Sequence, residues 1–313
     1  MNFLTSAASV FLLIVMAVPG YILRKARMIP EGFNHGVVTV LLYVSLPCLV
    51  THSFATKAFE PRLLADMAAA TLLSFAALLA GFGVSALCFA WAKDSGAKKA
   101  CVAAGYMNNC AFMGIPVLQA IFPGDGEPVI YAALFGVGFN LLAWTLLVYS
   151  LTGDRQYINV RNALLNPQIL TFAVALPIFF LRVNLPAPAL TALKYVGDMT
   201  TPLSMILLGI KLADAGIKTL AGDGKLYLSA AVKLIFVPLA ALAVLLAVRL
   251  VWPFGSVALT SLFLIMGMPA ASTVVMFAEK YGADSETASK CVLISSILCV
   301  ITIPMLTIIA AYL

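Results

Sequence analysis

Two apolar stretches of this chain are interrupted at their centres by residues that break helices and offer hydrogen-bonding groups. The first reads Gly105-Tyr-Met-Asn-Asn-Cys-Ala-Phe-Met-Gly-Ile-Pro116 and the second Met266-Gly-Met-Pro-Ala-Ala-Ser-Thr273. Proline lacks an amide hydrogen and clashes with the preceding turn. Broken helix ends leave free N–H groups and a positive dipole end, which together bind anions. The alternative is that these residues only kink their helices. The candidate binding residues at the two breaks are Asn108, Asn109, Pro269, Ala270 and Ser272.

Four further positions within apolar stretches are candidates for the same site. Asn140 and Pro47 are candidate substrate-binding residues. Asp198 either couples a cation or caps its helix at the outer interface, because intramembrane carboxylates are costly and usually functional. Lys233 either contributes to coupling or to the cavity, or extends its ammonium group to the cytoplasmic face, which is the interpretation we favour.

The composition indicates that lipid surrounds the elements that carry these residues. Of the 313 residues, 63% are apolar and 10% are charged, whereas a soluble domain has about 25% charged residues. A membrane-spanning helix needs roughly 20 apolar residues. Ten segments meet or approach that length, at residues 3–23, 36–55, 63–91, 97–121, 128–150, 167–182, 189–213, 225–251, 254–279 and 287–312. We therefore predict an all-α polytopic membrane protein with ten transmembrane helices.

The basic residues predict how these helices are oriented. The odd-numbered connections carry fourteen of the 19 Lys and Arg residues: Arg24, Lys25, Arg27, Lys93, Lys98, Lys99, Arg155, Arg161, Lys211, Lys218, Lys225, Lys233, Lys280 and Lys290. The even-numbered connections carry five: Lys57, Arg62, Arg182, Lys194 and Arg249. Because cytoplasmic loops are rich in Lys and Arg, both termini are expected outside the cytoplasmic membrane of a bacterium.

The ten segments divide into two halves of five, residues 1–150 and 167–313, joined by a cytoplasmic connecting loop over 151–166. An odd number of spans in each half places the halves in opposite orientations. Pro47 in the second segment corresponds to Pro202 in the seventh. Inverted repeats with interrupted helices are typical of secondary transporters, which bind substrate near the middle of the membrane.

Other classes of function lack the residues that they need. The two histidines, His35 and His52, have no partner at metal-ligand or catalytic spacing, and the six cysteines form no CxxC pair. We therefore predict no metal, no cofactor and no enzyme activity. The net charge of +6 is spread over small loop clusters, so nucleic acid is not an expected partner.

The two broken stretches resemble the auxin efflux carrier family, which includes the plant PIN carriers and many bacterial organic-anion permeases. The resemblance extends to Asn166-Pro167, Asp198, Leu207-Leu-Gly209 and Leu46-Pro47. It implies a fold similar to that of bile-acid/sodium symporters, with helices 4 and 9 crossing at their breaks. Helices 1, 2, 6 and 7 would form a dimerising scaffold, and helices 3–5 and 8–10 a transport domain that moves in an elevator-type cycle.

The resemblance also implies a bacterial homodimer that carries a small organic anion across the inner membrane, either a mono- or dicarboxylate or an auxin-like acid. The Pro-Asn pair of the plant carriers is replaced here by Asn108 and Asn109, and Ala270 replaces a polar residue. The sequence leaves open which anion is carried, in which direction, and whether Na⁺, H⁺ or the membrane potential drives it. The alternative is a membrane sensor that binds the anion without transporting it.

Overall fold

The computed structural model describes residues 3–30, 32–93, 95–214 and 224–313, and every named element in these ranges is a helix. The predicted all-α fold is therefore confirmed. The first half contains α1 (Phe3–Lys25), α2 (Phe33–Val40), η1 (Leu41–Ser45), α3 (Leu46–Thr56), α4 (Pro61–Cys88), α5 (Gly96–Tyr106), η2 (Cys110–Gly114), α6 (Ile115–Ile121), α7 (Glu127–Leu142), η3 (Ala143–Leu147) and α8 (Val148–Thr152).

The connection between the halves contains two short helices, η4 (Arg155–Tyr157) and α9 (Val160–Leu164), where the sequence predicted a plain loop. The second half contains α10 (Pro167–Phe180), α11 (Ala187–Asp198), α12 (Thr200–Asp214), α13 (Gly224–Ala231), η6 (Val232–Phe236), α14 (Val237–Val251), α15 (Ser256–Met266), α16 (Ser272–Lys280) and α17 (Ser285–Ala310). Lys218, which entered the charge count, lies outside the described residues.

Seven helical runs of the described chain are long and apolar enough to cross a membrane. They are Phe33–Thr56, Pro61–Cys88, Glu127–Thr152, Arg155–Phe180, Ala187–Asp214, Gly224–Val251 and Ser285–Ala310, which correspond to the predicted spans 2, 3, 5, 6, 7, 8 and 10. Predicted spans 4 and 9 each consist of two shorter helices, because both are interrupted at their centres. The first predicted span corresponds to α1, which has 23 residues.

Local sequence explains where several helices begin and where they change pitch. The side chains of Ser95, Asn166 and Asp284 accept hydrogen bonds from backbone amides in the first turns of α5, α10 and α17, as N-caps do. Three short π-helical turns, η1, η2 and η6, each end two residues before a proline, at Pro47, Pro116 and Pro238. A wide turn accommodates the hydrogen bond that proline cannot donate.

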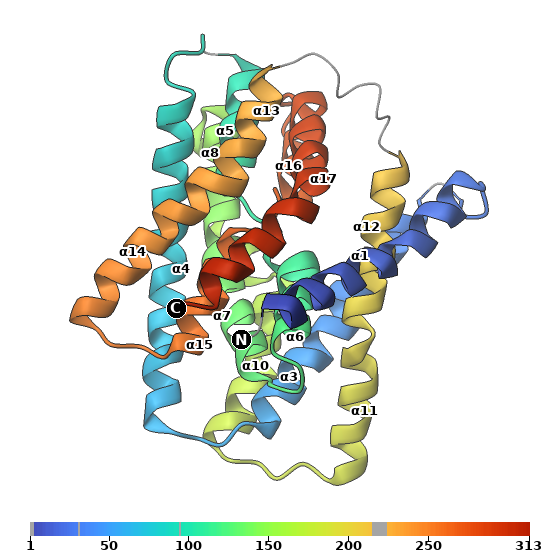
Figure 1. Cartoon of the computed structure of the whole chain (residues 1–313), viewed down its shortest axis with the longest axis vertical. Coiled ribbons are helices and arrows are strands. Elements are labelled where there is room, and N and C mark those ends of the chain that lie inside the picture. Colours follow the sequence, from blue (N-terminus) through green and yellow to red (C-terminus); the bar gives the residue numbers. More distant parts are fainter. Residues whose placement is uncertain (1–2, 31, 94, 215–223) are drawn as a thin grey trace.

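The first helix packs along α12, and the two lie side by side in Figure 1. Two glycines allow their backbones to approach closely. A Cβ atom on Gly20 would meet the carbonyl of Ile206, and one on Gly209 would meet the carbonyl of Ala17. Small residues at such contacts are typical of helix pairs in membranes. This pair fixes the position of α12, whose last two turns reach the interrupted segments.

A second contact joins the segments that carry Pro47 and Pro202. The Ser45 hydroxyl lies 2.7 Å from that of Thr200 and also donates to the Val196 carbonyl. Both hydroxyls are buried. The two segments that the sequence paired by their prolines therefore touch just before those prolines.

Candidate functional site

The two interrupted segments meet, as the resemblance to the auxin efflux carriers implied. Residues Asn108 and Ala270 form an antiparallel bridge between the end of α5 and the start of α16. The Asn109 amide donates to the Pro269 carbonyl at 2.8 Å, and the Ala271 amide to the Met107 carbonyl at 3.0 Å. Each break thus supplies hydrogen-bond partners for the other, which satisfies backbone groups that lipid could not.

Buried side chains stabilise the broken ends further. Asn108 donates from Nδ2 to the Ile265 carbonyl at 2.7 Å, and Lys233 donates from Nζ to the Met266 carbonyl at 3.2 Å. Both carbonyls lie in the last turn of α15, where the Ile265 carbonyl also accepts from the Met268 amide at 3.1 Å. The Ala270 amide donates to the Ser295 hydroxyl at 3.1 Å. Asn108 and Lys233 are each 0% exposed.

The favoured interpretation of Lys233 is therefore wrong. Its ammonium group does not extend to the cytoplasmic face, because the side chain is fully buried and binds a carbonyl at the second break. Snorkelling requires a clear path from the stem of the side chain to water. The π-helical turn η6 instead places this residue on the inner face of its helix.

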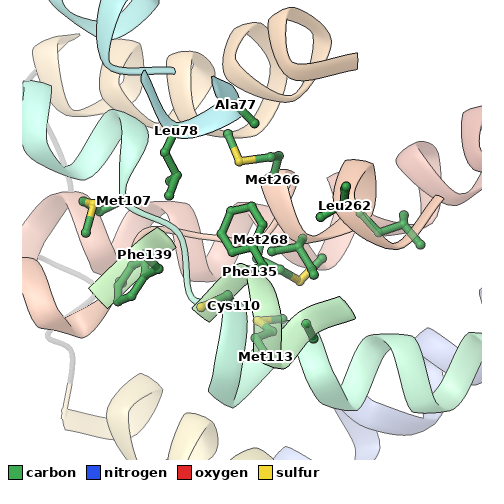
Figure 2. Close-up of a cluster of buried hydrophobic side chains, with 14 of the residues drawn as sticks. Ala77, Leu78, Met107, Cys110, Met113, Phe135, Phe139, Leu262, Met266 and Met268 are labelled. Carbon is green, nitrogen blue, oxygen red and sulfur yellow. The ribbon is translucent and has the colours of Figure 1, made fainter. Parts of the chain in front are cut away.

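The crossing rests on a hydrophobic cluster. Figure 2 shows Met107 and Cys110 from the first break, and Met266 and Met268 from the second, among side chains that include Phe135 of α7. All five are buried. An irregular backbone next to aromatic side chains leaves irregular spaces, and flexible methionines fill such spaces well. The cluster holds the two breaks in register.

A cavity of about 510 Å³ opens on one side of the crossing. Of the predicted site residues, Asn109, Ala270 and Ser272 line it. The remaining lining combines apolar side chains of η2, α12, α16 and α17 with polar and charged ones, from Asn34, Ser204, Lys211, Asp214, Glu279, Ser289 and Ser296. Concave sites with apolar walls and polar groups that fix orientation are the usual form of a small-molecule site.

Two lining residues, Asn109 and Ser272, carry hydrogen-bond donors from the two breaks. The Asn109 side chain accepts from the Phe112 amide through Oδ1 at 3.2 Å, so its NH₂ group is free to donate. The amides of Ser272 and Thr273 open α16 and have no backbone acceptor among the described residues. Such amides at a helix start favour an anion.

The remaining predicted site residues lie elsewhere and do not line the cavity. Asn140 is buried and donates to the Gly136 carbonyl and to the Gln168 side chain, both at 2.7 Å. Pro47 lies half-buried in the first turn of α3. Asp198 ends α11, is exposed and pairs with Lys194 at 2.5 Å. This position fits the interpretation of Asp198 as an interfacial residue better than that of a coupling carboxylate.

Sequence reasoning missed Lys211. It was counted among the residues of a cytoplasmic connection, but it lies in the last turn of α12 and lines the cavity. Its Nζ donates to the Ser272 hydroxyl at 2.7 Å. The available signal was an ionisable residue within an apolar run, Leu207-Leu-Gly-Ile-Lys-Leu212, which in a membrane helix indicates function.

The described residues contain no group of three or more His, Cys, Asp or Glu side chains that could hold a metal ion. The cavity is thus lined by neutral donors, the ammonium group of Lys211 and two carboxylates, those of Asp214 and Glu279. The neutral donors at the start of α16 and the ammonium group are of the kind that attracts an anion.

A helical protein with several apolar spans and a central cavity at two broken helices belongs to the class of multi-pass membrane transport proteins. Comparison with known proteins identifies the family. The profile of the membrane transport protein family matches residues 5–307, so this chain belongs to that family, as its resemblance to the auxin efflux carriers indicated. It is also 25% identical over 312 residues to an uncharacterized transporter of Methanothermobacter thermautotrophicus, covering 97% of this chain and 98% of the relative.

Proposed function

We propose that this membrane transport protein is a secondary transporter of small organic anions that carry a carboxylate. The observation that supports this most is the set of donors around one cavity at the crossing: the Asn109 NH₂ group and the amides that open α16. They would bind a carboxylate, and the apolar walls formed by Phe112 and Val275 would contact its carbon chain.

The architecture proposed for this activity has ten spans in two inverted halves, with both termini outside. Helices α4 to α8 and α13 to α17 would form the transport domain, and α1 to α3 with α10 to α12 the scaffold that dimerises. The cavity supports this division, because α12 forms one wall and the crossing forms the other. Substrate would then move with the crossing past α12 in an elevator-type cycle.

The test is uptake by the purified full-length protein in liposomes. We expect saturable uptake of a radiolabelled carboxylate by the wild type and loss of at least about tenfold in Asn109→Ala, because a hydrogen bond to a charged group is removed. Asn184→Ala, at an exposed loop residue, is the matched control and should transport normally. Normal uptake by Asn109→Ala would remove the site assignment.

The same assay separates the proposal from its alternative and addresses coupling. Binding of the acid without flux in any gradient would indicate a membrane sensor. Uptake measured with a Na⁺ gradient, a proton gradient or a membrane potential alone identifies the driving ion. The few carboxylates around the cavity do not by themselves require a Na⁺ gradient, a proton gradient or a membrane potential as the driving force.

A further inference from the structure

The cavity contains one cationic side chain that the binding of a single carboxylate at the crossing does not require. Lys211 comes from α12, whereas Asn109 and the amides of α16 belong to the crossing. Neutral donors at a helix start already suit one carboxylate. The ammonium group of Lys211 therefore represents a second, separate anion-attracting element in the same space.

No described carboxylate neutralises Lys211. Among the ion pairs of the described residues, none includes it. Asp214, less than one turn away and also at the cavity, pairs with Arg24 and accepts from the Asn34 side chain. The only polar partner of Lys211 in the described chain is the hydroxyl of Ser272. A hydroxyl is a weak partner for a partly buried ammonium group, because it carries no charge to offset the cost of desolvation.

The remaining acid at the cavity lies too far along α16 to serve as this partner. Glu279 stands about two helical turns from Ser272, and its side chain is exposed. Its negative charge would repel a long dianion that reached past α16. The distribution of charge thus favours a short ligand that binds between Lys211 and the crossing.

We propose that Lys211 determines specificity by binding the second carboxylate of a short dicarboxylic acid. This inference rests on the proposed function, because it assigns the first carboxylate to Asn109 and the start of α16. In the state described, the Ser272 hydroxyl occupies the place of that second carboxylate on the ammonium group. A dicarboxylate binds across the cavity from the crossing to α12, whereas a monocarboxylate leaves Lys211 hydrogen-bonded to the Ser272 hydroxyl.

The experiment compares succinate with butyrate, which has the same number of carbons and one carboxylate fewer. Dissociation constants are measured by calorimetry on the detergent-purified full chain near neutral pH. The wild type should bind succinate more tightly than butyrate. Lys211→Met should weaken succinate binding by about 10- to 100-fold, as expected for a lost charge-assisted hydrogen bond, and should change butyrate binding less than about threefold. Lys211→Arg keeps the charge and should retain the preference.

Two further variants complete the design. Lys194→Met removes a lysine charge at an exposed pair outside the cavity and should leave both constants unchanged. If Lys211→Met fails to purify as a folded protein, Lys211→Gln replaces it, since glutamine can still donate to Ser272 without a positive charge. The predicted loss of succinate binding is the same for both.

The outcomes distinguish the inference from the function on which it rests. If the variant without the charge bound both acids more weakly by the same factor, Lys211 would bind the single carboxylate, and the proposed specificity would be wrong. Unchanged constants for both acids would show a purely structural lysine and would also overturn it. In either case binding of carboxylates by the wild type leaves the proposed function in place. A wild type that binds neither acid contradicts both.

Discussion

Two adjacent asparagines at the first break have different tasks. The backbone turns tightly at Asn109, where the Cys110 amide donates to the Asn108 carbonyl at 2.9 Å. The Asn108 side chain points into the protein, where its Nδ2 donates to the Ile265 carbonyl, while Asn109 lines the cavity. The Oδ1 atom of Asn108 is buried without a hydrogen-bond partner in the described structure. Direct contact of Asn108 with substrate stays a prediction.

The first prediction separates these tasks. Asn108→Ala should lower the free energy of unfolding by about 1 kcal/mol, because the hydrogen bond from its Nδ2 to the Ile265 carbonyl is lost while the Met268 amide still donates to that carbonyl. Asn109→Ala should lower the free energy of unfolding less than Asn108→Ala does, and it should weaken substrate binding more. Thermal unfolding in detergent, with and without the acid, measures both effects. A destabilisation equal in the two variants would contradict the division.

The site residues that sequence alone could identify were those at the breaks. Asn109 and Ser272 follow from the presence of Pro, Gly and amides in mid-segment, since such residues are rare inside a span unless a cavity lies there. Lys233 could not be placed, because a π-helical turn changes which face of its helix the lysine occupies. Lys211 lies in a regular α-helix, and the sequence does not say which side of that helix faces the crossing. Hydropathy sets the length of a span but not its rotation.

At the scale of the helices, the close contact of α1 with α12 depends on two glycines, which have no side chain to separate the backbones. Gly20 and Gly209 leave room for backbone carbonyls of the opposite helix. Gly209 lies two residues before Lys211, so the same close contact that holds α12 also sets the position of the ammonium group. Sequence indicated the two helices but not this pairing, because small residues mark a contact face without naming its partner.

Gly209→Ala is the prediction at this scale. The added Cβ would meet the backbone of Ala17, which has no flexible end to move aside. We expect a large loss of stability, about 1–3 kcal/mol as for overpacking in a core, seen as a lower melting temperature and a lower yield of folded protein. Gly83→Ala in α4 is the matched control, since open space surrounds its position. An unaltered melting temperature for Gly209→Ala would show that the helices separate easily.

At the scale of the whole molecule, the all-helical fold and the apolar character of its spans followed from sequence more closely than any side-chain contact, and the resemblance implied the meeting of the two breaks. The count of ten spans stays a prediction. Seven predicted spans are found as helices long enough to cross a membrane, and the two interrupted ones meet as expected. The opposite orientation of the two halves concerns their arrangement in a bilayer. The proposed motion of the crossing past α12 concerns the change between transport states. Both stay proposals that depend on measurements of transport.

Relative motion can be tested with a cross-link between α12 and α6. The Thr201 hydroxyl donates to the Gln119 side chain at 2.7 Å, so a short bifunctional thiol reagent that forms reducible bonds can join cysteines at these two positions. The background carries serine at Cys48 and Cys88, the two cysteines that are not buried. If α6 moves past α12, linking the pair Thr201→Cys and Gln119→Cys with this reagent abolishes uptake in liposomes, and a reductant restores it.

The control pair joins two segments within the proposed scaffold. The hydroxyls of Ser45 and Thr200 lie 2.7 Å apart, and cysteines there tie η1 to α12 without touching α6. An elevator cycle leaves this distance fixed, so the linked Ser45→Cys and Thr200→Cys pair should transport as the reduced one does. Equal uptake by both linked pairs would mean that α6 and α12 move as one body. Substrate would then have to reach the other side by local rearrangement around Asn109, with α12 stationary against the crossing.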